Sequence, residues 1–444
     1  LMTQDAGADA LNTAVGFDAG GDITTGLRNT LMGHEAGNTL TTGGYNVAIG
    51  YASLGSEDAH GRNVAIGHRA LTTLNAGADG YNVAMGYNAG AEITTGANNT
   101  IIGALAGDAL NTGAYNVAVG QGALSMETAH GKNVAIGRSA LETLNAGADS
   151  YNVAVGFNTG TVLTTGAENV LVGGNAGDAL TTGAYNVAIG HVALGAEDAH
   201  GRNVAIGYAA LQNQDAGADA YNTAIGFYAG KNISTGIENT IIGGNAADGL
   251  TTASECTFVG ANAAAGQTIT GNQNTSLGRY TLHNLTDGIG NTAIGSQAML
   301  NGVVTGDYNT AVGKDAGASI TSGSHNVLIG TYAGDSLATG ERNTAVGNYA
   351  LSAEDGDGYN TAIGYAALLA QNAGATAYNV AVGYNAGQAI TTGVTNVIMG
   401  GNAALALTSG SDNIAIGYSA LSTEDARGRS IAIGTSALSS QNAA

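Results

Sequence analysis

The chain has 444 residues, of which 73 are glycine and none is proline or tryptophan, and its formal net charge is −21. Charged residues make up only 10% of it, well below the roughly one quarter of a typical globular protein. The acidic balance disfavours nucleic-acid binding, and the regular aliphatic content excludes disorder. No apolar run approaches the length that a membrane-spanning helix needs, so such a helix is excluded.

A five-residue pattern organises the chain from residue 12 to residue 434. It reads Asn, β-branched, small or aliphatic, aliphatic, Gly, as in Asn116–Gly120. The pattern occurs 25 times, and every fourth step between copies is slightly longer than the other three, so four copies make a superrepeat. Cys256 and Ser430 replace the Asn in two copies. Arrays this regular grow by stacking, so a single solenoid over 1–444 is predicted.

Each unit is expected to contain two short extended segments and two turns. In the first segment Val117 and Val119 alternate with small residues such as Ala118, and this period of two predicts a strand. The two valines are expected to face the interior of the coil and Ala118 to face outward. Gly120 then ends the strand, where the chain must adopt a positive φ or approach another backbone closely. The second extended segment follows this Gly.

Units this short cannot bury a face alone, and no segment has the 3.6-residue periodicity of a helix. The sequence therefore predicts an all-β parallel β-solenoid, or β-roll, with 25 rungs in four-rung superrepeats and about 17 residues in each rung. Order is disturbed over 251–308, where two steps are slightly longer than usual and an extra rung is inserted. The residues predicted to form the structural ladder are Asn46, Asn63, Asn116, Asn133, Ile136 and Gly137.

A regular change of residue size at the third position of the pattern suggests contact with a neighbouring chain. The position that is usually Ala becomes large in the second rung of each superrepeat, a rhythm that crowding in a thin coil does not obviously generate. If this position faces outward, the large residues mark a chain-to-chain contact. These residues are Leu31, Ile101, Leu171, Ile241, Leu328 and Ile398.

Acidic residues lie beside a histidine in a turn that recurs once in each of the first three superrepeats. Glu57, Asp58 and His60 are followed by equivalent residues at 127–130 and 197–200. Four stacked rungs separate the copies by about 19 Å, so a single ion cannot bridge them. Each copy would have to act alone, and a polar turn with a solvated histidine is the preferred interpretation. No metal site is predicted there.

Other chemical motifs are weak. Glu354–Gly358 gathers oxygen ligands that would hold Ca²⁺ weakly, but it lacks the glycine and aspartate spacing of calcium-binding β-rolls, so an acidic turn is preferred. The Gly-Lys pairs at 131, 230 and 313 are not followed by Ser or Thr, which excludes a phosphate-binding loop. No Ser, His and acid set departs from the repeat. Neither catalytic residues nor a cofactor are therefore predicted, and the chain is expected not to be an enzyme.

Tyrosine recurs directly before the Asn of many copies. Exposed tyrosine rows would suit stacking on sugars, but stacking between rungs at the corners of the coil is the preferred interpretation. These tyrosines are Tyr45, Tyr81, Tyr115, Tyr151, Tyr185 and Tyr221.

The repeat resembles two known types. Asn-Val-Ala-Ile-Gly, followed by small residues and Ala-Leu, is similar to the head repeats of trimeric autotransporter adhesins and to the tail-fibre repeats of phages and large viruses. The resemblance covers residues 12–438. It implies a parallel β-roll, commonly trimeric, that serves attachment on a cell or virion surface. The adhesin repeat is shorter than the unit of this chain, and the four-rung superrepeat is not part of its pattern.

The sequence therefore predicts the structural shaft of an extracellular or virion-surface fibre. Because Leu1 and Ala444 both fall within a repeat, the chain is expected to be a portion of something longer or to continue end-on into another copy. Self-association, as a trimer or an end-to-end polymer, is the predicted partnership. The alternatives are an adhesin that binds cell-surface glycans through a repetitive face, an ice-binding solenoid and a polysaccharide-degrading solenoid.

Overall fold

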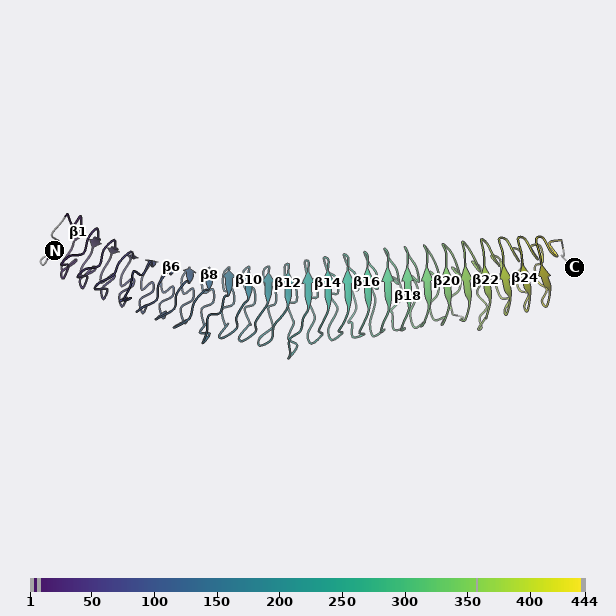
Figure 1. Ribbon diagram of the computed structural model, residues 1–444. Coiled ribbons are helices and arrows are strands. Elements are labelled where there is room, and N and C mark those ends of the chain that lie inside the picture. Colours follow the sequence, from purple (N-terminus) through teal and green to yellow (C-terminus); the bar gives the residue numbers. More distant parts are fainter. Residues whose placement is uncertain (1–3, 6–8, 357, 441–444) are drawn as a thin grey trace. The chain divides into compact units, whose positions relative to one another are not determined.

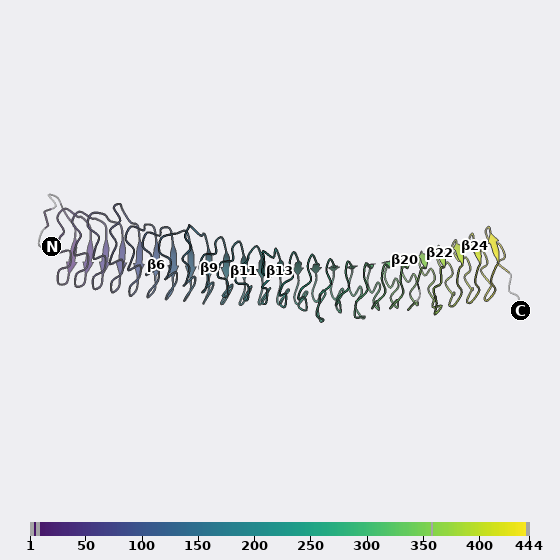
Figure 2. The same ribbon diagram turned by 90° about the horizontal axis from the view of Figure 1, so that it is seen from below.

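The computed structural model describes residues 4–5, 9–356 and 358–440. The chain divides into two compact units, Leu1–Tyr221 and Asn222–Ala444, each of which is described by itself. Within each unit, one three-residue strand per turn lies beside the strand of the next turn (Figure 1). The strands of the first unit form a single row in the view at right angles (Figure 2). The described residues contain no helix, so none that could span a membrane.

The strands of the first unit are β1 (Thr13–Val15), β2 (Thr30–Met32), β3 (Val47–Ile49), β4 (Val64–Ile66), β5 (Val83–Met85), β6 (Thr100–Ile102), β7 (Val117–Val119), β8 (Val134–Ile136), β9 (Val153–Val155), β10 (Val170–Val172), β11 (Val187–Ile189) and β12 (Val204–Ile206). Those of the second unit are β13 (Thr223–Ile225), β14 (Thr240–Ile242), β15 (Thr257–Val259), β16 (Thr275–Leu277), β17 (Thr292–Ile294), β18 (Thr310–Val312), β19 (Val327–Ile329), β20 (Thr344–Val346), β21 (Thr361–Ile363), β22 (Val380–Val382), β23 (Val397–Met399), β24 (Ile414–Ile416) and β25 (Ile431–Ile433).

Neighbouring strands pair in parallel at equivalent positions of the repeat. Strand β7 pairs with β8, so that Val117 lies opposite Val134 and Ala118 opposite Ala135. The same register holds for the other pairs described within each unit, for example β3 with β4 and β23 with β24. The predicted all-β parallel β-solenoid, with one strand for each copy of the pattern, is confirmed.

The second extended segment of each unit is not a strand. After the Gly that ends the strand, the chain forms consecutive turns in which non-glycine residues adopt the left-handed conformation, such as Asn88 (φ 53°) and Leu124 (φ 54°). A left-handed L-residue costs roughly 1–2 kcal/mol, and burial of Leu124 offsets that cost. The expectation of a second extended segment was therefore wrong, whereas the strand-ending Gly has the expected positive φ, as at Gly120 (137°).

The two faces of the strand lie opposite to the prediction. Ala118 is fully buried inside the coil, whereas Val117 and Val119 are half-buried and point outward. Ile136 is 37% exposed, so it belongs to the ladder through its backbone and contributes its side chain to the outer surface. The interior of the thin coil is already filled by leucines from the turns, such as Leu124, and this leaves room for only a small side chain on the strand.

The asparagines form the predicted ladder. The backbone N–H of Asn133 donates to Oδ1 of Asn116 (3.1 Å), and the N–H of Asn152 donates to Oδ1 of Asn133 (3.0 Å). The Nδ2 group of Asn133 donates to the carbonyl oxygen of Gly131 (3.2 Å). These asparagines are fully buried, so the ladder supplies partners that their amide groups need inside the coil. The pair Asn46 and Asn63 shows the same bond at 3.0 Å.

The six residues predicted to contact another chain lie inside the coil instead. Each has an exposed fraction of 0%: Leu31, Ile101, Leu171, Ile241, Leu328 and Ile398. The turns of these residues leave room inside the coil, because a small residue follows six positions later: a glycine in four turns (Gly37, Gly107, Gly177 and Gly334) and Ala247 or Ala404 in the other two. A Cβ on Gly107 would meet Ile101 Cδ1 at 3.1 Å and Leu110 Cδ1 at 2.9 Å. The large strand residue therefore fills the space that this glycine leaves.

The irregular region 251–308 keeps the stacking of the repeat. Strands β15, β16 and β17 pair in the ordinary register, and additional bridges join Leu250 to Ile269 and Leu285 to Val304. The extra residues of the two longer steps are accommodated in turns, so the strands themselves continue.

Candidate functional site

The outer face of the strands is a uniform surface in each unit. The first position of every strand is Val, Thr or Ile, and the third is Val, Ile, Met or Leu. Most of these side chains are half-buried, and several are more open, such as Met32 at 46% and Leu277 at 48%. Each unit thus presents two parallel rows of uncharged side chains along its sheet, and we call this surface the outer sheet face.

A row of tyrosines and cations lies at the turn before the strand. Arg62 bonds to Asp79 (2.9 Å) and to the hydroxyl of Tyr81 (2.5 Å), and its guanidinium lies over the Tyr81 ring, 5.5 Å from the centroid. Equivalent clusters surround Lys132 and Arg202. These tyrosines therefore contact cations of neighbouring turns, whereas the predicted stacking of their rings on one another is not seen among the described contacts.

A second aromatic row follows the glycines that end strands β1 to β5. The rings of Phe17, His34, Tyr51, His68 and Tyr87 stack in sequence, with centroids 5.0, 5.5, 5.2 and 5.1 Å apart. Because neighbouring rings cover one another's faces, a sugar would meet ring edges in the middle of this row. The row therefore stabilises the stacking of turns.

The threonine pairs are also used within the coil. Oγ1 of Thr24 donates to the carbonyl oxygen of Thr41 (3.1 Å), and Oγ1 of Thr41 donates to that of Asp58 (2.9 Å). The first threonine of the pair thus bonds to the next turn. An ice-binding lattice would need these hydroxyl groups to face water in an unbroken array.

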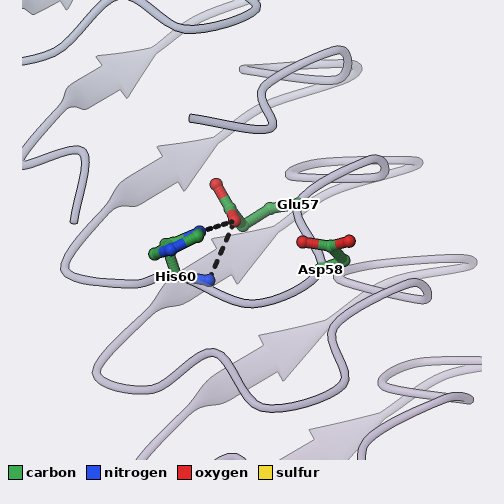
Figure 3. Close-up of side chains that lie close together, drawn as sticks. All are labelled: Glu57, Asp58 and His60. Atoms are coloured by element: carbon green, nitrogen blue, oxygen red, sulfur yellow. Dashed lines mark hydrogen bonds and ion pairs between the residues drawn. The ribbon is translucent and has the colours of Figure 1, made fainter. Parts of the chain in front are cut away.

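The turn at residues 57–60 differs from the polar, solvated turn that the sequence predicts. Glu57 is fully buried, and its Oε1 accepts the backbone N–H of His60 (3.0 Å) and lies 3.7 Å from Nδ1 of the same residue. Figure 3 shows this oxygen facing both nitrogens, with Asp58 beside them. The imidazole is partly exposed, and Asp58 is exposed. A polar turn with a solvated histidine was predicted, but its glutamate lies inside the coil.

The copy at residues 197–200 has the same geometry. Glu197 is fully buried, its Oε1 accepts the N–H of His200 (3.0 Å), and Nδ1 of His200 lies 3.6 Å from that oxygen. Burial raises the pKa of Glu57 and of Glu197 above the ordinary value of 4.5. In these two copies the Glu, Asp and His ligand atoms lie within 4.8 Å of one another, so among the described residues these are the groups of three that could hold a metal ion.

Sequence reasoning missed the burial of the glutamate. A signal was present, because glutamate occupies the equivalent position at 57, 127, 197, 354 and 424, whereas the next residue changes from Asp to Thr at position 128. All five glutamates are fully buried. Glutamate thus recurs at this position in every regular superrepeat, and Gln267 replaces it only in the disturbed one.

The remaining motifs have local roles. Asp357, within the acidic turn 354–358, lies outside the described residues, so the expectation of weak Ca²⁺ binding stays a prediction. Lys132 pairs with Asp149 (2.7 Å), and Lys314 pairs with Asp315 (3.0 Å). Hydrogen bonding to Lys132 lowers the pKa of Asp149.

The residues that break the pattern in 251–308 make separate contacts. Arg279 lies over the ring of Tyr280, 4.4 Å from its centroid, and Asp287 accepts a hydrogen bond from Thr286 (3.1 Å). Cys256 fills an Asn position of the ladder, where its N–H donates to Oδ1 of Asn239 (3.0 Å). Cys256 therefore takes the place of an asparagine in the ladder through its backbone N–H.

Cys256 should react slowly with thiol reagents while the protein is folded. Its side chain is 1% exposed, and burial raises the pKa of the thiol to about 11. About one molecule in a thousand would then carry the thiolate at pH 8. Ellman's reagent should therefore report almost no free thiol in buffer and one thiol per chain in guanidinium chloride. Full labelling of the native chain within minutes would contradict the buried position.

No protein-family model matches the chain, and no curated protein sequence matches it.

Proposed function

We propose that the chain is a structural repeat shaft of an extracellular or virion-surface fibre or filament, in which copies of the chain associate through their outer sheet faces and serve attachment. The observation that carries the proposal is the outer sheet face itself. Two rows of uncharged, half-exposed side chains repeat at every turn of each unit. The third-position row is apolar throughout, and contiguous apolar surfaces are typical of protein interaction sites.

A second copy of the chain is the occupant that fits this face best. Strands one turn apart are about 4.8 Å apart in every copy, so two outer sheet faces can meet rung by rung without loss of register. The charge of −21 is carried elsewhere, because neither row contains a charged residue. A trimer, which the resemblance implies, or an end-to-end polymer would each serve a stiff shaft. No catalytic group is needed for this function.

Charges placed on the outer sheet face should separate the copies. Changing Ile102 and Ile136 to Lys, two turns apart, would require two charges to be desolvated in any contact through this face. Sedimentation should show an oligomer for the wild type and a monomer for the double variant, with the same circular dichroism spectrum. Thr95→Lys with Thr165→Lys adds the same charge at exposed turns and should leave the oligomer unchanged.

Two results would argue against this function. If the wild-type chain sediments as a monomer at tens of micromolar, the copies do not associate and the proposal is wrong. If the Ile102 and Ile136 variant still forms an oligomer, the copies associate through a face other than the outer sheet face. Glycan binding stays the alternative function, and it would have to use ring edges or the outermost rings of the aromatic rows. Binding on a glycan array that is lost when residues 251–308 are deleted would favour this alternative.

A further inference from the structure

We propose that the turns at residues 57–60 and 197–200 each bind one divalent transition-metal ion, with Zn²⁺ as the working probe. The ligands would be the carboxylates of Glu and Asp and the Nδ1 atom of His in each turn. This inference goes beyond the proposed shaft function and does not depend on it.

The first observation is a buried carboxylate with one oxygen left over. The side chains of Glu57 and Glu197 are 0% exposed. In each, Oε1 accepts the N–H of the histidine three residues later, whereas Oε2 accepts no hydrogen bond of normal length and angle from the described residues. The backbone N–H of Ala76 also interacts with the Glu57 carboxylate. A buried carboxylate oxygen without a partner is costly, and a bound cation would compensate it.

The second observation is the histidine nitrogen that faces this carboxylate. Nδ1 of His60 and of His200 is buried and has no hydrogen-bond partner among the described residues, although both rings are partly exposed. The distance from Nδ1 to the glutamate Oε1 is 3.7 Å in one turn and 3.6 Å in the other. Two ligands about 2.1 Å from a tetrahedral ion lie about 3.4 Å apart, so a shift of a few tenths of an ångström suffices.

The donor set selects the class of metal. One imidazole with two carboxylates suits Zn²⁺, Co²⁺ or Ni²⁺, whereas Mg²⁺ and Ca²⁺ prefer oxygen ligands alone. The exposed carboxylate of Asp58 leaves the outer side of the site open to water, which would complete the coordination.

The backbone of the turn is fixed by the solenoid. Nδ2 of Asn46 donates to the carbonyl oxygen of His60 (3.3 Å), and the N–H of Thr41 donates to the carbonyl oxygen of Asp58 (2.6 Å). Ligands carried on a fixed backbone lose little freedom when an ion binds, which favours binding.

The copy at residues 127–130 is a natural comparison within the chain. Glu127 is fully buried, and its Oε1 lies 3.8 Å from Nδ1 of His130, but Thr128 replaces the aspartate. Here Oε2 of Glu127 accepts the N–H of Ala146 (3.2 Å), and the hydroxyl of Thr128 donates to Oδ1 of Asn145 (3.1 Å). Glu424, which has no histidine, also leaves its Oε2 without a partner among the described residues, so the feature that distinguishes the two turns from the copy at 127–130 is the third ligand, Asp58 or Asp198.

The turn does not need a histidine in order to enclose its glutamate. At Glu424 the histidine position is Arg427, and Oε1 of Glu424 still accepts the N–H of that residue (3.0 Å). The turn therefore forms around the buried glutamate whether or not an imidazole is present. His130 Nδ1 lies in the same way, 3.8 Å from Glu127 Oε1, so two ligands are in place in all three histidine-bearing turns and the aspartate completes the set in two of them.

Titration of the full chain with ZnCl₂ in a buffer free of chelators tests the proposal. We expect two ions per chain, and Co²⁺ should give the visible absorption of a nitrogen- and oxygen-ligated site. Asp58→Thr with Asp198→Thr installs the residue that the chain itself carries at position 128, so the turns should fold normally. This variant should bind about tenfold or more weakly at both sites.

The reverse substitution should create a site. Thr128→Asp completes the ligand set at Glu127 and His130, and the stoichiometry should rise from two ions to three. His60→Asn with His200→Asn should abolish the two original sites while the circular dichroism spectrum is retained.

The proposal would be overturned by any of three results. These are the absence of saturable Zn²⁺ binding to the wild type, two ions per chain with unchanged affinity in the Asp58 and Asp198 variant, and two ions per chain in the Thr128→Asp variant. The second result would assign the ions to other histidines, such as His34 or His283.

Discussion

Replacing Gly137 with valine should lower the free energy of unfolding of the first unit by about 4 kcal/mol or more. Gly137 has a φ of 134°, a conformation that β-branched residues avoid. A Cβ at this position would meet the carbonyl oxygen of Gly156 on the next turn at 2.1 Å and its carbon at 2.6 Å. Both atoms are backbone, so neither can move aside without breaking the stack.

The Gly137→Val substitution should first destabilise the turns next to it, because each turn of a solenoid contacts only its neighbours. Hydrogen exchange should show faster exchange of the amides of β7, β8 and β9, and the thermal transition should shift to lower temperature.

Gly147 provides the matched control for this substitution. It also has a positive φ, 65°, but a Cβ there would meet no atom within 4 Å. Asn tolerates this left-handed conformation, so Gly147→Asn should change the free energy of unfolding by less than about 1 kcal/mol. Equal melting of Gly137→Val and wild type, or an equal loss in both variants, would contradict the requirement for glycine at the stacked position.

The strand, the number of residues in each rung and the asparagine ladder could be predicted from the sequence. Each depends on a residue type that recurs at a fixed spacing. Asn116 must supply both a donor and an acceptor at every turn, and few side chains can replace it inside a coil. Gly120 lies at a positive φ against the next backbone. Both demands repeat at each rung, so the sequence repeats them too.

The inward face was not predictable from alternation alone. A period of two divides Val117 and Ala118 between two faces, but it does not tell which face is inside. Hydrophobicity favoured the valine as the buried residue, and this choice was wrong. The deciding quantity is the space left by Leu124 and its equivalents, which come from turns whose left-handed conformations have no clear sequence signal.

The burial of Glu57 was missed for a related reason. Glutamate beside Asp58 and His60 resembles an exposed acidic turn, and composition alone gives no indication that one of the three side chains points inward. The backbone N–H of His60 supplies the bond that makes this burial possible. That bond depends on the local path of the turn, which composition does not specify.

Replacing Ile101 with alanine separates the two explanations of the four-rung rhythm. Ile101 is fully buried between Gly107 and Leu110, so its truncation would leave a cavity and should cost about 2–4 kcal/mol of stability. The outer residue Ile102, which is 36% exposed, is the matched control. Ile102→Ala should cost less than about 1 kcal/mol, because much of its side chain already contacts water.

The two substitutions should affect the association of copies in the opposite order from their effects on stability. Ile102 lies on the outer sheet face, so its truncation should weaken the oligomer measured by sedimentation, whereas Ile101→Ala should leave the oligomer intact in the folded fraction. If Ile101→Ala instead dissociated the copies without lowering the melting temperature, the large residues of the second rung would be a chain-to-chain contact after all. Because the two residues are adjacent on β6, any difference between them must arise from the face on which each side chain lies.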